Sequence, residues 1–191
     1  MSQNQKPEAL EAQVDDARKG KKGPPPLDQW HPALSGDIDI RIARDGNWYF
    51  KGDRMHREAL TRLFSSIMRR EEDGEYYLVT PVEKWRITVE DTPLLAHTLT
   101  ATGEGRNQVL QVITSAGESI TLGPEHPLTV NNYPGVDEPR PVVTIRHGLE
   151  ARLVTSAFYD LARYVVENPT GAPNSFGVWS DGLFFEIGPG A

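Results

Sequence analysis

The stretch LTRLFSSIMRREEDGEYYLVTPVEK, residues 60–84, carries the clearest structural signal in the chain. Apolar residues at helical spacing predict an amphipathic helix over residues 57–70, because one stripe of that helix would face a core. Asp73-Gly74 would end the helix, and the aromatic and branched residues 76–80 are typical of a strand. Pro81 has no backbone N–H to donate to a sheet, so we expect the strand to end there.

Strand signals lie on both sides of this stretch. Isoleucines alternate with polar residues over 38–42, which is the pattern of a half-buried strand. The following Asp45-Gly46 pair predicts a hairpin turn, because both turn residues must tolerate positive φ. Over residues 85–146, short alternating segments are separated by turns, which predicts an antiparallel meander. A second amphipathic helix is expected over residues 149–166, and a second hairpin around Asp181-Gly182.

Two similar segments indicate duplication. ARDGNWYF (residues 43–50) and WSDGLFF (residues 179–185) each place an Asp-Gly turn between apolar strands. We therefore predict an α+β chain with a duplicated two-domain core. It would have a disordered tail at residues 1–26, an N-terminal α+β domain at 27–84 and a C-terminal α+β domain at 85–191. A meander followed by one helix, as in the second domain, is also the order of elements in pleckstrin-homology-like domains.

Composition excludes several classes of protein. The 191 residues include no cysteine, which rules out a disulfide framework, zinc–thiolate sites and thiol catalysis. The net charge of −7 repels phosphate backbones, so we expect no nucleic-acid partner. The opening residues lack the apolar core of a secretory signal, and no apolar run is long enough to span a bilayer. We therefore expect a soluble, cytoplasmic protein without a membrane partner.

The sequence carries no recognisable catalytic motif. Its five histidines show no zinc-binding spacing, and it has neither a P-loop nor a G-x-G-x-x-G loop. Ser65 and Ser66 lie in the predicted helix rather than at a strand-to-helix turn, which makes them poor hydrolase nucleophiles. Asp37 and Asp39 could share a Mg²⁺ ion, but they lack the further ligands that such a site needs. We predict no metal or cofactor and favour binding over catalysis, although carboxylates distant in sequence could still meet in the fold.

Seven polar residues are candidates for contacting an anionic ligand, namely Arg41, Arg44, Thr80, Glu83, Lys84, His126 and Arg146. Residues 80–84 are the predicted hinge between the domains, and domain interfaces favour small-molecule pockets. Thr80 offers a hydroxyl, Glu83 an acceptor for a ribose hydroxyl and Lys84 a positive charge for phosphate. The arginines could bind phosphate through two hydrogen bonds each. Alternatively, Glu83 and Lys84 form a solvated strand end or a salt bridge that ties the domains together, and Arg41 pairs with neighbours on an exposed face. In the same alternative, His126 is structural.

Several motifs together resemble the family of domains of unknown function numbered 1285, over nearly all of residues 24–188. The motifs are GDIDIRIARDG (36–46), RLFSSIMRREEDGEYYLVTPVEK (62–84), EHPLTV (125–130), IRHGLEA (145–151), FYDLA (158–162) and GVWSDGLFF (177–185). The resemblance implies a bacterial protein with a duplicated α+β core and a second domain similar to the pleckstrin-homology-like fold. It also implies a site between the two domains for a nucleotide-like ligand, and a role in signal transduction.

Two functional hypotheses follow from these observations. The first is a non-enzymatic module that binds a nucleotide-like anionic ligand at the interdomain interface in bacterial signalling. The second is a protein-interaction module without a small-molecule ligand. In that hypothesis the proline-containing tail and the loop at residues 131–141 would contact a partner protein.

Overall fold

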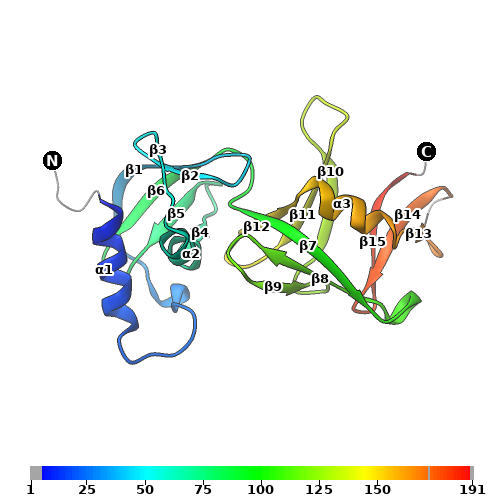
Figure 1. Ribbon diagram of the computed structural model, residues 1–191, viewed down its shortest axis with the longest axis horizontal. Coiled ribbons are helices and arrows are strands. Elements are labelled where there is room, and N and C mark those ends of the chain that lie inside the picture. The colour runs from blue at the N-terminus through cyan, green and yellow to red at the C-terminus, as the bar shows by residue number, and fades with distance from the viewer. Residues whose placement is uncertain (1–5, 172, 190–191) are drawn as a thin grey trace. The chain divides into compact units, whose positions relative to one another are not determined.

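The computed structural model describes residues 6–171 and 173–189 of the chain. The chain divides into two compact units, unit 1 (Met1–Pro93 and His147–Leu149) and unit 2 (Leu94–Arg146 and Glu150–Ala191). Each unit contains a six-stranded sheet and helical segments, so the predicted α+β class is confirmed (Figure 1). None of the helices in these described residues is both long and apolar enough to cross a membrane.

The sheet of unit 1 has the strand order β3-β2-β1-β6-β5-β4. The central strands β1 and β6 are parallel, and the other neighbours are antiparallel. The strands are β1 (Leu34–Ile42), β2 (Trp48–Phe50), β3 (Asp53–Arg54), β4 (Met68–Arg70), β5 (Tyr76–Val79) and β6 (Lys84–Val89). The helices are α1 (Pro7–Arg18) and α2 (Glu58–Ser66), and a 3-10 turn, η1 (Leu27–Gln29), precedes β1.

One face of this sheet forms the core of unit 1. The isoleucines of residues 38–42 are 5% exposed or less, and polar residues between them point the other way, as predicted for a half-buried strand. Phe64 of α2 is fully buried, with its ring centroid 6.2 Å from that of Trp48 on β2. The predicted hairpin at Asp45-Gly46 is confirmed, because it joins β1 to β2.

Helix α1 lies in the segment that the sequence predicted to be a disordered tail. Residues 1–5 of that tail are outside the described residues. Leu10 and Val14 are one helical turn apart and fully buried, and α1 packs against α2. Pro7 stands in the first turn, where its missing N–H costs no hydrogen bond. Burial of two such side chains stabilises α1 on unit 1 by about 1.5–3 kcal/mol each, which the polar composition of the segment did not reveal.

The helix predicted over residues 57–70 is shorter in the structure. Met68–Arg70 instead form the edge strand β4, in which Met68 pairs with Leu78 of β5. Met68 is fully buried there, as it would be in a longer helix, so the apolar pattern fits either structure. Pairing with β5 decides the outcome. The strand predicted over residues 76–80 is confirmed as β5.

The change from unit 1 to unit 2 falls after β6, between Pro93 and Leu94. Strand β6 begins at Lys84 and pairs with both β1 and β5, so it is a central strand of unit 1. Residues 80–84, the predicted hinge, therefore form the β5–β6 connection inside unit 1. Residues 85–93 likewise belong to unit 1 rather than to the second domain.

Unit 2 contains a second six-stranded sheet in the order β10-β11-β12-β7-β8-β9 and a small sheet in the order β13-β14-β15. The larger sheet comprises β7 (Leu94–Thr102), β8 (Val109–Thr114), β9 (Ser119–Thr121), β10 (Leu128–Asn132), β11 (Pro139–Thr144) and β12 (Glu150–Leu153). The smaller sheet comprises β13 (Val166–Glu167), β14 (Ser175–Ser180) and β15 (Leu183–Pro189). The remaining elements are α3 (Thr155–Ala162) and a 3-10 turn, η2 (Gly105–Asn107).

Two predictions for unit 2 need correction. The segment at 149–166, predicted as one helix, contains strand β12, the shorter helix α3 and the start of β13. Its alternating buried residues Ala151 and Leu153 pair with β7, which makes them part of a sheet. That pairing is parallel, so the larger sheet is not the purely antiparallel meander that the sequence predicted.

The predicted duplication is confirmed by the sheets. In each six-stranded sheet the first strand along the chain pairs in parallel with the last. Each of these two central strands is flanked on its outer side by two further antiparallel strands. The two Asp-Gly turns are not equivalent, however. Asp45-Gly46 joins the first two strands of the unit 1 sheet, whereas Asp181-Gly182 joins β14 to β15 in the small sheet. Both residues of the latter turn have positive φ, 48° and 77°, as a two-residue hairpin requires.

We predict that Leu10→Ala destabilises unit 1 by about 2–4 kcal/mol, because the fully buried side chain leaves a cavity under α1. Leu34→Ala, at a position that is 51% exposed, should change the free energy of unfolding far less. Urea unfolding followed by tryptophan fluorescence would measure both variants, since Trp30, Trp48 and Trp85 lie in unit 1. Equal stability of the two variants would show that α1 does not dock as described.

Candidate functional site

The structure separates the predicted ligand contacts of unit 1 into two groups. Arg41 and Arg44 lie at the end of β1, whereas Lys84 starts β6 opposite Leu34, at the beginning of β1. At about 3.3 Å per residue, the two ends of the nine-residue strand β1 are roughly 26 Å apart. One small ligand cannot touch both groups, so the seven predicted residues do not form a single site.

Arg41 and Arg44 share the carboxylate of Glu90, which follows β6. Arg41 forms an ion pair with Glu90, and its guanidinium carbon lies 4.4 Å from the ring centroid of Tyr49. The backbone N–H of Arg44 donates to the other oxygen of Glu90 at 2.9 Å. That backbone bond and the hydrogen bond from Arg41 hold the pKa of Glu90 below its usual value. The surface ion pair considered for Arg41 is present, and a role of Arg41 and Arg44 in ligand binding stays a prediction.

Thr80 and Glu83 tie the β5–β6 turn to helix α1 through Gln13. The Thr80 hydroxyl, fully buried, donates to the Gln13 carbonyl oxygen at 2.7 Å and accepts the Glu83 N–H at 3.0 Å. The Gln13 amide nitrogen in turn donates to the Glu83 carboxylate at 2.7 Å. Trp85 adds an indole N–H to the same carboxylate at 3.3 Å. These contacts give both predicted residues a structural role.

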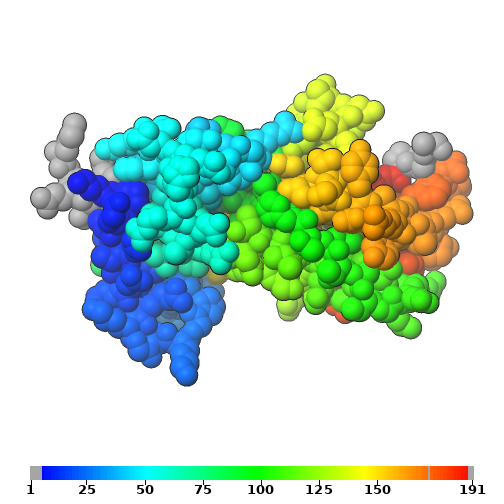
Figure 2. All heavy atoms as spheres, in the orientation of Figure 1, coloured from blue at the N-terminus to red at the C-terminus, as the bar shows by residue number. Residues whose placement is uncertain are grey.

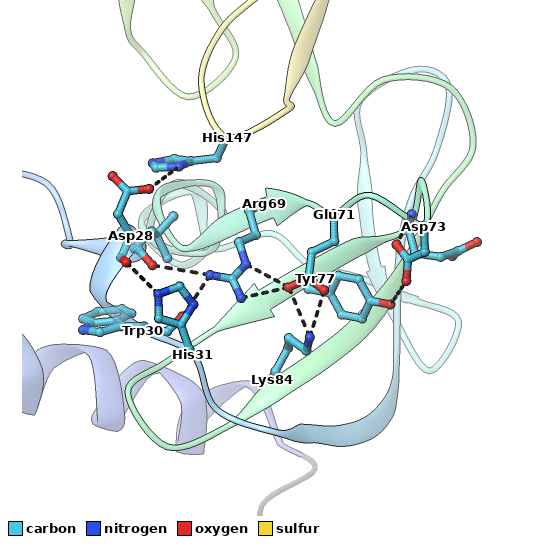
Figure 3. A network of polar contacts seen from close by, with 11 residues as sticks. Asp28, Trp30, His31, Arg69, Glu71, Asp73, Tyr77, Lys84 and His147 are labelled. Carbon is cyan, nitrogen blue, oxygen red and sulfur yellow. Dashed lines mark hydrogen bonds and ion pairs between the residues drawn. The ribbon is translucent and has the colours of Figure 1, made fainter.

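Lys84 belongs to a half-buried ion cluster on the polar face of the unit 1 sheet (Figure 3). Lys84 and Arg69 each approach the Glu71 carboxylate to 2.8 Å, and the two cationic side chains are only 16% and 15% exposed. Partial burial acts to raise the pKa of Glu71, but the hydrogen bonds and charges of Lys84 and Arg69 outweigh it. The pKa therefore lies below its usual value. Lys84, Arg69 and Glu71 together carry one net positive charge, and both cations are already paired with the Glu71 carboxylate.

Tyr77 lies beside this cluster and extends it along the sheet. The Lys84 ammonium lies 4.8 Å from the Tyr77 ring centroid, and the phenol donates to Asp73 at 2.6 Å (Figure 3). This hydrogen bond, aided by burial, raises the pKa of Tyr77 to about 12. Tyr77 is therefore a hydrogen-bond donor at neutral pH and is not poised to act as a base.

Two loop segments of unit 1 close over the other side of the cluster. Arg69 donates to the carbonyl oxygen of Trp30 at 2.9 Å, and a His31 ring nitrogen lies 2.8 Å from the Asp28 carbonyl (Figure 3). The Asp28 carboxylate is 3.4 Å from His147, which the contact pattern assigns to unit 1. Arg69 and Trp30 are 39 positions apart in sequence, and Asp28 and His147 are 119 apart, so no local pattern could have indicated these two contacts.

The two candidates in unit 2 also have partners within the chain. His126 Nδ1 lies 3.0 Å from the Thr144 carbonyl oxygen, which links the loop before β10 to β11. Arg146 forms an ion pair with Glu118 at 2.7 Å. The contact of His126 matches the structural alternative considered for it, and a role of His126 and Arg146 in binding stays a prediction.

A cavity of about 290 Å³ in unit 1 combines basic and apolar side chains. It lies where the start of α1, the β2–β3 hairpin and the start of α2 meet, and Figure 2 shows the dark blue start of α1 beside the cyan segment that contains α2. The basic lining groups are Lys51, Arg54, His56 and Arg57, the acidic ones Glu8 and Asp53, and the apolar ones Pro7, Phe50, Met55 and Leu60. We call this the α2 cavity.

The local sequence explains how the cations reach the α2 cavity. KGDRMHR, residues 51–57, places four basic groups within seven residues, and this is the signal that could have indicated the cavity. Lys51 and Gly52 both have positive φ, 51° and 85°, which makes the β2–β3 turn tight. Arg57 pairs with Glu11 of α1 at 2.9 and 3.2 Å, so α1 and α2 are joined at the cavity wall.

In the described part of the chain, no three histidine, aspartate or glutamate side chains are grouped to hold a metal ion. The α2 cavity offers hydrogen-bond donors and positive charge beside an apolar wall, which is the kind of lining that binds an amphiphilic anion. Apart from this cavity, the charged groups named above are used in pairs that hold the sheet and its loops together.

Two six-stranded sheets with the same strand order, in units of similar size, define the class of protein as a duplicated α+β fold. Residues 25–92 match the family described as domain of unknown function (DUF1285), N-terminal domain, and residues 93–187 match its C-terminal domain. The chain belongs to the DUF1285 family, as the sequence motifs predicted. The family boundary at residues 92/93 agrees with the end of unit 1.

Two solved structures resemble the chain. A DUF1285 family protein from Silicibacter pomeroyi DSS-3 is 42% identical, with 93% of this chain and 94% of that chain covered and a TM-score of 0.82. A DUF1285 family protein from Shewanella baltica OS155 is 27% identical, with 65% of this chain and 90% of that chain covered and a TM-score of 0.51. No curated protein was found to match the chain.

We predict that Glu71→Gln lowers the stability of unit 1 by about 1–2 kcal/mol at pH 7, because two half-buried cations lose their shared carboxylate. Glu72→Gln, next to it on an exposed position, is the matched control and should have little effect. Thermal unfolding of both variants would measure the difference.

The effect of Glu71→Gln should depend on pH. The folded pKa of Glu71 is depressed below 4.5, so its contribution is complete above that pH and is lost as the pH falls through the folded pKa. The melting temperatures of the variant and the unmodified protein should therefore converge only below about pH 4.5. A gap that stays constant from pH 7 to acid would contradict this assignment.

Proposed function

We propose that the chain is a non-enzymatic binding module for a small, nucleotide-like anion, and that the α2 cavity is the binding site. The observation that carries the proposal is the meeting of four basic side chains with an apolar, partly aromatic wall in one cavity of about 290 Å³. A nucleotide has the same division, since its phosphates are anionic and its base has apolar faces. Pockets of this kind use a few polar groups to orient a ligand that is otherwise held by apolar contact.

The positions of the cations support binding of phosphate oxygens. Lys51 and Arg54 come from the β2–β3 hairpin, and Arg57 precedes the first turn of α2, so the charges enter from two elements. Phosphate binding by arginine can use two parallel hydrogen bonds, and lysine adds a point charge. The ring of Phe50, in the same lining, supplies an aromatic face for a base.

Binding is better supported than catalysis at this cavity. Its described lining contains no serine, threonine or cysteine, and one histidine. A nucleophile held by a neighbouring base is the usual mark of covalent catalysis, and no such pair lines the cavity. We therefore propose a sensor or carrier of the ligand, without a cofactor, and place it in bacterial signal transduction as the family resemblance suggests.

The proposal differs in location from the interdomain site that the motifs suggested. The assignment of that site to residues 80–84 relied on their being a hinge, but they form the turn between β5 and β6 and the first residue of β6, within unit 1. The pleckstrin-homology-like relation of the second domain stays a proposal from the order of elements in the sequence, since the larger sheet of unit 2 contains the parallel pair β7–β12. The alternative, a protein-interaction module, loses one support, because Leu10 and Val14 of the expected flexible arm are buried in α1.

A thermal-shift titration of the full chain with ATP, GTP, cyclic dinucleotides, adenosine and inorganic phosphate would test the proposal. A ligand that binds the folded state raises the melting temperature in a saturable way. We expect nucleotides to do so, and Lys51→Gln together with Arg54→Gln to weaken the binding about tenfold or more.

Arg62→Gln is the matched control for the loss of charge, because Arg62 lies on the exposed side of α2 and outside the cavity lining. Its affinity for nucleotide should equal that of the unmodified chain. A flat response to every nucleotide at millimolar concentration would overturn the proposed function. Unchanged affinity in the Lys51 and Arg54 variant would overturn the location of the site.

A further inference from the structure

Unit 2 contains a cavity of about 300 Å³ between the β10–β11 hairpin and helix α3, with strand β12 as its floor. These elements adjoin on the face of unit 2 seen in Figures 1 and 2. Its two walls carry aromatic, proline and hydroxyl-bearing side chains, namely Tyr133, Pro139, Pro141, Thr155, Phe158 and Tyr159. We call it the α3 groove. It shares no lining residue with the α2 cavity, so its function is independent of the proposed nucleotide site.

One side of helix α3 forms the first wall of the α3 groove. Phe158 and Tyr159 follow Thr155 by three and four positions, so the three side chains lie on the same side of the helix. Phe158 is half-buried, whereas Tyr159 is 71% exposed. Most of the surface of Tyr159 is therefore available to a partner, and tyrosine is one of the residues that contribute most to binding.

The β10–β11 hairpin forms the opposite wall of the α3 groove. Tyr133 is half-buried and Pro141 is buried, whereas Pro139 is exposed. The backbone N–H of Tyr133 donates to the carbonyl oxygen of Glu138 at 2.9 Å, which closes the hairpin loop and fixes this wall. Val136 is 54% exposed in the same loop and adds apolar surface at the hairpin tip.

The charged side chains of the α3 groove are already used within the protein. Arg152 and Glu138 each interact with another group of the chain, and the neighbouring Arg140 and Glu150 form an ion pair at 3.3 Å. A ligand that displaced one of these partners would leave a charge without its complement, which costs affinity. The groove therefore suits a ligand that is held by apolar contacts and by hydrogen bonds to neutral groups.

The floor of the α3 groove offers no open sheet edge. Strand β12 is paired with β11 on one side and with β7 on the other. A peptide that binds by strand addition needs an exposed edge. A peptide in this groove must therefore keep an extended backbone without forming sheet hydrogen bonds.

We propose that the α3 groove binds a proline-rich segment of a partner protein in the polyproline II conformation, with a basic residue at one end. This conformation has no internal hydrogen bonds, so its carbonyl oxygens can accept from groups in the groove. The hydroxyls of Thr155 and Tyr159 are such donors.

The spacing of prolines in this conformation fits a groove with aromatic groups on both walls. Prolines three positions apart lie on the same side of a polyproline II helix, about 9 Å from each other. They can pack against Tyr133 on the hairpin wall and against Phe158 and Tyr159 on the helix wall. Because the conformation is already formed in the free peptide, little ordering entropy is lost on binding.

The charge of unit 2 selects the residue that flanks the prolines. Residues 94–146 and 150–191 contain ten aspartates and glutamates, five arginines and no lysine, which gives a net charge of −5. Asp137 is exposed in the hairpin loop beside the groove, where its carboxylate accepts from the neutral amide of Asn132 at 2.9 Å. A basic residue near this carboxylate complements the charge of the unit, whereas an acidic residue is repelled.

The proposal can be tested by fluorescence anisotropy with a labelled peptide of one arginine followed by six prolines, titrated with the full chain. We expect saturable binding, at least about tenfold tighter than that of a peptide of one arginine followed by three Gly-Ser pairs. The second peptide has the same length and charge but is flexible and lacks proline rings. Tyr159→Ala should weaken binding of the proline peptide about tenfold, and it should fold because the position is exposed.

The part of the proposal that concerns charge needs a peptide with glutamate in place of the arginine. We expect this peptide to bind several-fold more weakly at low salt, and the difference to disappear in about 0.5 M NaCl. Asp137→Asn should reduce the preference for arginine and leave the binding of the prolines intact. A preference of unchanged size in this variant would overturn the role of Asp137.

Two control variants change the same chemistry outside the groove. Leu183→Ala removes an apolar side chain that is 41% exposed, and Glu186→Gln removes an exposed carboxylate from β15. Both should bind the proline peptide like the unmodified chain. Absence of binding at millimolar concentration would overturn the proposal, as would equal binding of the Gly-Ser peptide. Unchanged affinity in Tyr159→Ala would overturn the assignment of the site to the α3 groove.

Discussion

The parallel pairing of the first and last strands of each six-stranded sheet is the constraint on which both units depend. Antiparallel neighbours can be joined by a tight turn, but two parallel neighbours need a connection that returns the chain to the starting edge. In unit 1 the connection from β1 to β6 contains β2, β3, α2, β4 and β5. Since β1 and β6 occupy the centre of the sheet, β2 and β3 lie outside β1, and β5 and β4 lie outside β6. In unit 2 the same constraint places β8 and β9 outside β7, and β11 and β10 outside β12.

This arrangement also determines where cavities form. Short hairpins at the flank of a sheet leave the helix beside them only partly covered, and the α2 cavity lies where the β2–β3 hairpin meets the start of α2. In unit 2 the helix follows the central strand β12 directly, since β12 ends at Leu153 and α3 begins at Thr155. One cavity of unit 2 is therefore bounded by the central strand β12, helix α3 and the β10–β11 hairpin. The same sheet topology yields different cavities because the helix enters at a different point.

Local patterns in the sequence were sufficient where neighbours along the chain decide the structure. The alternation at residues 38–42 predicted β1, and the Asp-Gly pairs predicted two hairpins, because turn chemistry is local. Met68 was assigned to a helix because its burial fits a helix or a strand, and pairing with Leu78 settles which one forms. Strand β6 was assigned to the second domain because its partner β1 lies some 50 positions earlier. Non-local pairing of this kind leaves no trace in a single sequence.

The candidate site was predicted poorly for the same reason. Lys84 has the charge that a phosphate site needs, but it is already paired with Glu71, which it shares with Arg69. That carboxylate is 13 positions away, in the β4–β5 connection. By contrast, the basic run at residues 51–57 becomes a cavity wall only when α1 docks beside it. Glu11 of α1 holds Arg57 through two hydrogen bonds, so an anion that engages this guanidinium must compete with Glu11. Helix α1, which the buried side chains of Leu10 and Val14 anchor, therefore shapes the α2 cavity. Through Glu11 it also reduces the positive charge that Arg57 offers to an anion.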